Sequence, residues 1–247
     1  MFWKEKPLSY DICIPQRKKP AEEMTHREME AFFQWSMSVL PERIEYLSSR
    51  VCENLHLPRE RLTLSEESLI PLWEWFLSTA EIEDSPETAL QWFWEHDTHP
   101  EPFRRILLEQ RRRQFSLETE YILQDIGRYW GEVFVKTVPG ITWTYYEKPK
   151  SDFFVNKPVL QGFADFNYDP PFRMFFEPVH MAHVQAARLM DNSQKPEDLL
   201  RVYKLWREKS IQLHHYAPGQ PLDQGYIRSV RGEPDPPKKR RKDNAEV

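Results

Sequence analysis

Apolar residues recur at helical spacing through much of this chain, most clearly after Ser116. There the apolar positions follow the period of a helix with one buried face. Ser116 is a predicted N-cap, followed by Glu118 and Glu120 in the first turn, where the helix dipole favours negative charge. Pro139 and Gly140 are expected to end the helix, because proline cannot continue it and glycine allows a turn. The apolar face consists of Ile122, Leu123, Ile126, Tyr129, Trp130, Val133 and Phe134.

Two glycines, Gly127 and Gly131, lie on one side of this predicted helix. Each glycine costs a helix about 1 kcal/mol relative to alanine. A cost of this kind suggests that another part of the backbone approaches the helix closely at these positions. Charged residues are interleaved with the glycines, so the spacing is not the dimerisation motif of membrane helices.

The chain before Ser116 is predicted to be mainly helical. Thr25 and Glu28 form a capping-box pattern that starts a helix. Pro41 is expected to break or kink this helix, and a second helix is predicted over Glu42–Leu55. Further helices are predicted from Glu66 to about Thr79, after Ser85-Pro86-Glu87, over the arginine-rich segment 103–115, at His180–Met190 and at Glu197–Ser210.

Short strands are predicted where apolar and polar residues alternate. They are Ser9–Ile14, Ile141–Tyr145, Pro158–Phe163 and Phe172–Phe176. Helices followed by a few strands and then by helices are typical of an α+β fold. We therefore expect a predominantly helical α+β fold with a small sheet in the second half. Residues 1–230 are expected to form a single domain, and 231–247 a disordered basic tail.

Composition narrows the classes of function. The chain has 247 residues, a formal net charge of −5 and 14% aromatic residues, which favours a folded globule. A mildly acidic chain is a poor general binder of nucleic acid, because neutralising phosphates supplies most of that affinity. Cys13 and Cys52 make no disulfide framework, which favours a reducing compartment. No signal-peptide pattern or long apolar run is present, so we expect a soluble cytoplasmic protein without membrane contacts.

One histidine pair is a candidate metal site. His180 and His183 lie three residues apart near Glu177, and on a helix they share a face from which two imidazoles can reach one metal ion. The pattern is not the HExxH zinc signature. A pair of surface or interface histidines is the alternative interpretation. These three residues are the basis of a metal-dependent enzyme hypothesis.

Acidic residues provide a second set of candidates. Glu118, Asp125 and Glu132 recur every seven residues, so they line up along one edge of the predicted helix. Aligned carboxylates can hold a metal or do acid–base work, and the alternative, which we favour, is a solvated acidic edge. Glu132 follows Gly131 beside a tryptophan, and we expect it to be partly buried. Asp165 lies in a loop-rich stretch, which suits either function or turn formation with aromatic packing.

Basic residues form a third set of candidates. They could bind RNA or an acidic partner protein. The alternative is a solvated face whose charge is balanced by nearby glutamates. The basic run near the C-terminus matches a nuclear-import cluster, a motif that also arises in solubilising tails. The candidate nucleic-acid contacts are Arg104, Arg105, Arg111, Arg112, Lys238, Lys239, Arg240 and Arg241.

Several common catalytic motifs are missing from the sequence. It contains no G-x-x-x-x-G-K-[ST], no G-x-G-x-x-G and no G-x-S-x-G. Neither cysteine has the sequence context of a nucleophile. These absences disfavour nucleotide hydrolases, dinucleotide oxidoreductases and serine hydrolases, and we expect no cofactor.

Part of the chain resembles a loosely defined set of uncharacterised bacterial cytoplasmic proteins. The shared features are a helix ending in a Gly-Glu pair, here Gly131-Glu132, a strand containing Trp143, and the segment Pro158-Val159-Leu160. The resemblance is confined to Asp125–Tyr146 and Lys157–Phe163. Some members of the set are thought to be immunity proteins that neutralise a toxin.

The resemblance implies a role for the acidic residues, because Glu118, Asp125 and Asp165 would then face a basic toxin surface. It transfers no catalytic residue. Our leading hypothesis is a non-enzymatic cytoplasmic protein of the immunity type that acts by binding another protein. The alternatives are the metal-dependent enzyme and a nucleic-acid-associated protein.

Overall fold

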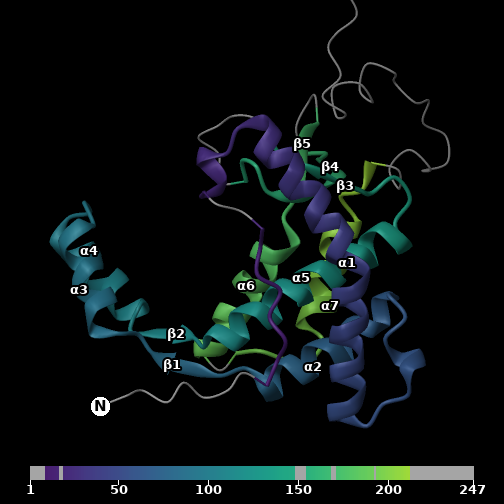
Figure 1. Cartoon of the computed structure of the whole chain (residues 1–247), viewed down its shortest axis with the longest axis horizontal. Helices are drawn as coiled ribbons and strands as arrows, with labels where there is room; N and C mark the ends of the chain where they lie inside the picture. The colour runs from purple at the N-terminus through teal and green to yellow at the C-terminus, as the bar shows by residue number, and fades with distance from the viewer. Residues whose placement is uncertain (1–8, 17–18, 148–153, 168–170, 192, 212–247) are drawn as a thin grey trace, which may run out of the picture.

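The computed structural model describes residues 9–16, 19–147, 154–167, 171–191 and 193–211. Within these residues the fold is α+β, with seven α-helices and two small antiparallel sheets (Figure 1). The three-stranded sheet lies in the second half of the chain, so the predicted fold class is confirmed. None of the described helices combines the length and the apolar composition needed to cross a bilayer.

The elements follow the chain in three groups. The first group is α1 (His26–Leu55) and α2 (Leu69–Thr79). The second is β1 (Ile82–Asp84), α3 (Glu87–His96), α4 (Glu101–Gln110) and β2 (Arg113–Phe115). The third is α5 (Leu117–Thr137), β3 (Thr142–Tyr145), β4 (Pro158–Asp165), β5 (Phe172–Phe176), α6 (Pro178–Ala187) and α7 (Asp198–Arg207).

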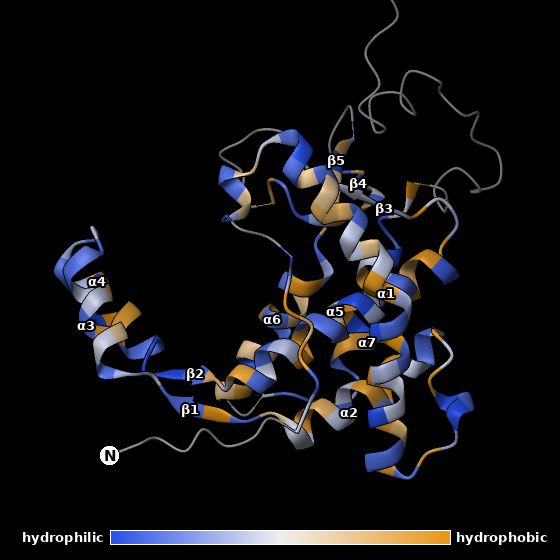
Figure 2. Ribbon diagram, viewed as in Figure 1, coloured by the Kyte–Doolittle hydropathy of each residue, from blue (hydrophilic) through white to orange (hydrophobic). Residues whose placement is uncertain are grey.

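Helix α5 lies at the centre of the hydrophobic core, as its apolar face predicts. Its N-cap is Ser116, whose side chain accepts a hydrogen bond from the Thr119 amide. The ring of Phe134 lies 4.6 Å from that of Tyr203 on α7 and 5.1 Å from that of Phe176 on β5, measured between centroids. Figure 2 shows hydrophobic residues gathered where α2, α5 and α7 meet. The core therefore joins helices from both halves of the chain.

The three-stranded sheet has the order β3-β4-β5, with both pairs antiparallel. Its central strand β4 is the most buried, and Phe163 on β4 packs edge-on against Phe134 of α5. The sheet thus rests on α5, and the chain leaving β5 at Phe176 enters α6 directly alongside the same helix.

The two glycines of α5 allow this close contact, as the sequence suggested. A Cβ atom on Gly127 would lie 2.5 Å from the Cα atom of Val179 in the first turn of α6. A Cβ atom on Gly131 would lie 2.2 Å from the indole of Trp143 on β3. Both distances are shorter than carbon–carbon contacts allow, so a side chain at Gly127 would have to displace backbone, and one at Gly131 would have to displace the indole of Trp143.

Three sequence predictions were wrong in detail. Pro41 does not interrupt α1, which is one continuous helix. A proline inside a helix costs about 3 kcal/mol, and burial of Leu40, Leu47 and Val51 on the same helix offsets that cost through tertiary packing. Residues 9–14 form no strand, because they run over α1 and α5 without a strand partner.

The third difference is a strand at the end of the arginine-rich segment. Arg113–Phe115 is strand β2, which pairs antiparallel with β1. The sequence analysis did not predict β1, because a strand of three residues carries too little alternation to be recognised. Pairing between residues about thirty positions apart therefore overrides the local helical pattern.

The first prediction concerns the glycine contact. We expect Gly127→Ala to lower the free energy of unfolding by about 1–2 kcal/mol, because overpacking against backbone outweighs the gain in helix propensity. Urea denaturation measures the change. As a control, Ser38→Ala at an exposed position of α1 should stay within about 0.5 kcal/mol of the natural protein. An alanine variant as stable as the natural chain would contradict the contact.

Candidate functional site

A pocket of about 370 Å³ opens between α1, α5 and α6, beside the start of β3 and β4. This volume is in the range that holds a small organic molecule. Its apolar lining comes mainly from α1 and β3, and its polar lining from α5 and α6. The residues that line it include Phe32, Met37, Leu40, Glu120, Gln124, Arg128, Trp143, Lys157, Glu177, His180 and His183.

Helix α6 brings three of these side chains into the pocket. Glu177 is its N-cap residue, and His180 and His183 follow one turn apart on the same face. Because Gly127 lets the first turn of α6 contact α5, this face meets Glu120 on α5. The sequence grouped Glu177, His180 and His183 correctly, and the structure places all three at one pocket.

His183 is fixed at both ring nitrogens. Its Nε2 lies 2.7 Å from Oε2 of Glu120, and its Nδ1 lies 2.8 Å from the carbonyl oxygen of Val179. Burial alone would lower the pKa of His183, but these two hydrogen bonds and the charges of Glu120 and Glu177 raise it above the usual value. With acceptors at both nitrogens, the protonated ring is favoured, and both nitrogens are already engaged in hydrogen bonds.

Glu177 is a buried carboxyl group at the N-terminus of α6. It accepts hydrogen bonds from the backbone amides of Val179 and His180. Burial raises its pKa to about 7, against the opposing effects of those hydrogen bonds and of the nearby Lys157 and His183 charges. Near neutral pH the side chain therefore exchanges a proton with solvent, which is unusual for a glutamate.

His180 has the opposite character to His183. Burial lowers its pKa, and the positive charges of Lys157 and His183 lower it further. At neutral pH its ring is therefore uncharged. The pKa values of two histidines one turn apart thus shift in opposite directions, because burial at His183 is outweighed by its hydrogen bonds and nearby carboxylates together, whereas burial dominates at His180.

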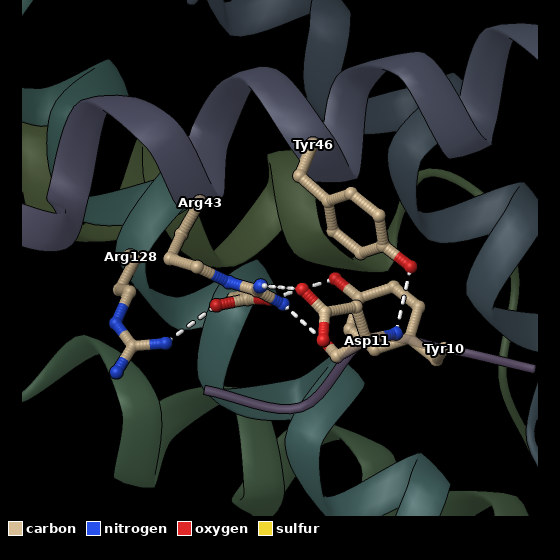
Figure 3. A network of polar contacts seen from close by, with 6 residues as sticks. Tyr10, Asp11, Arg43, Tyr46 and Arg128 are labelled. Atoms are coloured by element: carbon tan, nitrogen blue, oxygen red, sulfur yellow. Dashed lines mark hydrogen bonds and ion pairs between the residues drawn. The ribbon is translucent and has the colours of Figure 1, made fainter. Parts of the chain in front are cut away.

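The wall formed by Arg128 is supported by a buried polar network (Figure 3). Arg128 donates to Oδ1 of Asp125, and Oδ2 of the same carboxylate accepts from Arg43 at 2.6 Å and from the Tyr10 hydroxyl at 2.7 Å. Asp125 is 1% exposed and Arg43 4%. Arg43 also donates to the carbonyl oxygen of Asp11, at 2.6 Å. The network holds the segment around Tyr10 against α1 and α5.

The balance of charge at the pocket is positive. Arg128, Lys157 and the protonated form of His183 contribute positive charge, whereas the acidic residues of the lining are Glu120 and Glu177, and the pKa of Glu177 is raised. The Asp125 carboxylate behind Arg128 is offset by Arg43. A negatively charged ligand is therefore favoured over a cation.

This geometry gives the metal hypothesis no support. No group of three or more His, Cys, Asp or Glu side chains in the described ranges is arranged to hold a metal ion. The oxygens of Glu177 face backbone amides, and both nitrogens of His183 are already bonded. Metal ligation by Glu177, His180 and His183 stays a prediction.

The acidic candidates are not gathered on one surface. Asp125 is buried, so the expectation of a solvated acidic edge is wrong for it. Glu118 accepts hydrogen bonds from Ser9. Glu132 accepts a 2.6 Å bond from the Trp143 indole and ties β3 to α5.

Asp165 lies apart from these three acids, at the end of β4. Its carboxylate accepts from the backbone and side-chain amides of Asn167, at 3.1 and 2.8 Å. This is the turn-forming alternative that the sequence analysis kept open. A partner-binding role for Glu118, Asp125, Glu132 and Asp165 stays a prediction.

The arginine candidates of the described chain belong to α4 and its C-terminal end, and all four contact neighbours within the α3–α4 hairpin. Arg104 lies over the Trp94 ring at 4.2 Å, and Arg111 over the Phe93 ring at 4.4 Å. Arg105 pairs with Glu101 and Arg112 with Glu109. The candidates Lys238, Lys239, Arg240 and Arg241, with the rest of the predicted basic tail, lie outside the described residues.

Sequence reasoning missed three pocket residues, Glu120, Arg128 and Lys157. The signal for Glu120 was available, since an acidic residue in the first turn of α5 faces whatever packs on that turn. For Arg128 and Lys157 no local signal exists, because they come from distant segments and meet only in the folded chain.

Comparison with protein-family models, curated proteins and solved structures found no match to this chain. The resemblance to toxin-immunity proteins therefore stays a prediction. The function must be argued from the chemistry of the site, since a fold of this class is compatible with many functions.

The second prediction concerns the buried carboxylate. We expect Asp125→Asn to lower the free energy of unfolding by about 3 kcal/mol or more, because it removes the buried counter-charge of Arg43 and leaves only the exposed Asp11. Asp11→Asn is the matched control, since it changes the exposed partner of the same arginine, and it should cost less than about 1 kcal/mol. Equal losses in urea denaturation for the two variants would contradict the network.

The third prediction concerns the pH dependence of stability. The pKa of Glu177 is raised from 4.5 to about 7, so the folded state keeps a proton that the unfolded state loses. Glu177 therefore makes the free energy of unfolding fall as the pH rises from 4.5 to about 7. Above that range it does not contribute to the pH dependence of stability. In Glu177→Gln the slope is absent, and the stability of the variant relative to the natural protein should rise between pH 5 and pH 8.

Loss of the helix cap in Glu177→Gln adds an offset that does not depend on pH, so the slope of the stability difference is the quantity to measure. Glu118→Gln on α5 serves as the control. Thermal unfolding from pH 5 to pH 8 gives both differences. A stability difference for Glu177→Gln that is flat across this range would refute the raised pKa.

Proposed function

We propose that the protein binds a small molecule that carries an oxyanion, such as a carboxylate or phosphate, attached to an apolar group. The observation that supports this most directly is the pocket in which Arg128 and Lys157 face the apolar side chains of α1. Arginine and lysine are the usual protein partners of carboxylate and phosphate oxygens. The occupant would place its anion at α5 and its apolar group at α1.

The apolar wall supports the second half of this proposal. Phe32, Met37 and Leu40 come from one face of α1, and Trp143 lies on β3 across from it. Pockets for small molecules are lined mainly by such side chains, with a few polar groups that set orientation. An inorganic anion alone would leave this wall without a ligand contact.

Binding without turnover is the chemistry that the lining residues support best. The hydroxyl of Ser36, on the pocket wall, donates to the Phe32 carbonyl at 2.8 Å and is not poised as a nucleophile. His183 is fixed by two hydrogen bonds. Glu177 changes the charge of the pocket with pH.

Affinity for an anion should therefore fall as pH rises from 6 to 8. In this interval Glu177, with a pKa of about 7, gains negative charge. The pKa of His183 is raised and that of His180 is lowered, so His183 is the histidine that keeps its positive charge to the higher pH. The negative charge that Glu177 gains therefore opposes an anion in the pocket.

The fourth prediction uses benzenesulfonate as the probe, because it stays anionic at every pH of the experiment. We expect it to bind at pH 6 more tightly than neutral benzyl alcohol, and to bind more weakly at pH 8. Arg128→Met should weaken binding by about tenfold or more. Titration followed by NMR of the His180 and Trp143 rings measures affinity and location together.

Two further variants make this test decisive. Lys157→Met should also weaken binding, and it leaves the contact between Arg128 and Asp125 in place. Arg61→Met removes an exposed arginine away from the pocket and should have no effect. Equal affinity for benzenesulfonate and benzyl alcohol, or shifts confined to residues outside the pocket, would refute the proposal.

Interaction with another protein is a second candidate function, and the observation that favours it lies far from the pocket. Helices α3 and α4 stand apart from the other helices at the end of the β1–β2 ribbon (Figure 1). Their surface carries Trp92, Phe103 and Ile106, all more than half exposed. Exposed aromatic residues on a projecting element are typical of a protein-binding surface.

A further inference from the structure

The projecting element is a helical hairpin on a two-stranded base, which we call the arm (residues 82–115). Strands β1 and β2 pair in register from Ile82 opposite Phe115 to Asp84 opposite Arg113. Ser85 extends the base by donating its amide to the Arg112 carbonyl at 2.8 Å. The base thus fixes the direction of the arm, and the two helices extend beyond it.

The arm lacks a hydrophobic core of its own. Helices α3 and α4 are described in full, and among their residues only Phe93 is buried. Trp92 and Phe103 are each 62% exposed and Ile106 is 57% exposed. Helices of ten residues are marginal in water without packing. A surface that covers these side chains would therefore stabilise the arm.

A groove at the base of the arm includes one of these exposed side chains, Trp92. It lies between α3 and the segment that leads from α4 into β2, with a volume of about 540 Å³. Leu90, Trp92 and Phe93 form its apolar part, and Arg111 and Arg113 form its basic edge. An apolar ridge flanked by acidic residues fits such a groove.

Charge is divided between the two halves of the arm. Segment 87–97, which contains α3, has three acidic residues and no lysine or arginine, a net charge of −3. Segment 101–113, which contains α4, has five arginines and two glutamates, a net charge of +3. A partner that matches this surface must be basic beside α3 and acidic beside α4.

We infer that the partner is a second copy of this chain, joined arm to arm about a two-fold axis. In that arrangement α3 of each copy faces α4 of the other, so the −3 and +3 segments meet twice. Two helical hairpins then form a four-helix bundle, in which Trp92, Phe103 and Ile106 are covered. A partner of a single charge would match only half of the arm.

The expected dimer is weak. Each ten-residue helix is about 15 Å long, so an arm offers less than the roughly 800 Å² per partner of a standard interface. We expect dissociation at concentrations on the order of tens of micromolar. This inference rests on the second candidate function and does not depend on the pocket.

The fifth prediction is tested by sedimentation velocity of the full chain over about 1–300 µM, a range that spans the expected affinity. The natural protein should pass from monomer to dimer, and Phe103→Glu should remain monomeric. The matched control is Phe172→Glu, because Phe172 on β5 is 64% exposed and lies outside the arm. That variant should dimerise like the natural protein.

A charge exchange tests the arrangement of the helices. The variant E87K/E95K makes both halves of its arm positive, and R105E/R112E makes both halves negative. Each variant alone should be monomeric, and an equimolar mixture should form a heterodimer. Circular dichroism of each variant verifies that its helices are retained.

Two outcomes would overturn the inference. One is a natural protein that stays monomeric at the highest concentration. The other is a dimer that forms equally well with Phe103→Glu. The interaction function itself is tested separately, by comparing the proteins that the natural chain, Phe172→Glu and Phe103→Glu retain. That function fails if Phe103→Glu loses no stoichiometric protein that the other two retain.

Discussion

The contact between α5 and α6 is the constraint on which the pocket depends. Gly127 removes the one side-chain atom that would hold the helices apart, and the first turn of α6 then meets α5 at Val179. This spacing sets Glu120 within hydrogen-bonding distance of His183. It also buries Glu177 at the start of α6, where desolvation outweighs two backbone hydrogen bonds and raises its pKa. A small residue in one helix therefore decides the protonation of side chains on another.

Behind Arg128, the buried carboxylate of Asp125 is stabilised by the groups that bond to it. An isolated buried carboxylate would be strongly unfavourable. Asp125 is surrounded by Arg43, Arg128 and the Tyr10 hydroxyl, so its oxygens are satisfied from three directions. The same contacts link α1, α5 and the N-terminal segment around Tyr10. These hydrogen bonds and ion pairs hold separate elements together, as apolar packing does in the core. They also orient Arg128, which lines the pocket.

The arm and the core of the molecule differ in how far their apolar side chains are buried. Around α5, aromatic residues are fully buried and contact one another across several elements. In the arm, cation–π contacts such as Arg104 on Trp94 and Arg111 on Phe93 hold two short helices together while other apolar side chains face solvent. The core is stabilised by the aromatic side chains that it buries. We propose that the arm is stabilised by a contact with a second copy of the chain.

The sequence by itself determined the fold class, the capping box at Thr25, the N-cap at Ser116 and the close approach at Gly127, because each depends on residues near one another in the chain. It also grouped Glu177 with its two histidines. The tertiary structure alone decided that Pro41 stays within a helix, since long-range packing exceeds a local cost. It alone decided that Asp125 is buried and that Arg128 joins the pocket, because a periodic pattern shows which residues share a helix face and not which distant groups that face will meet.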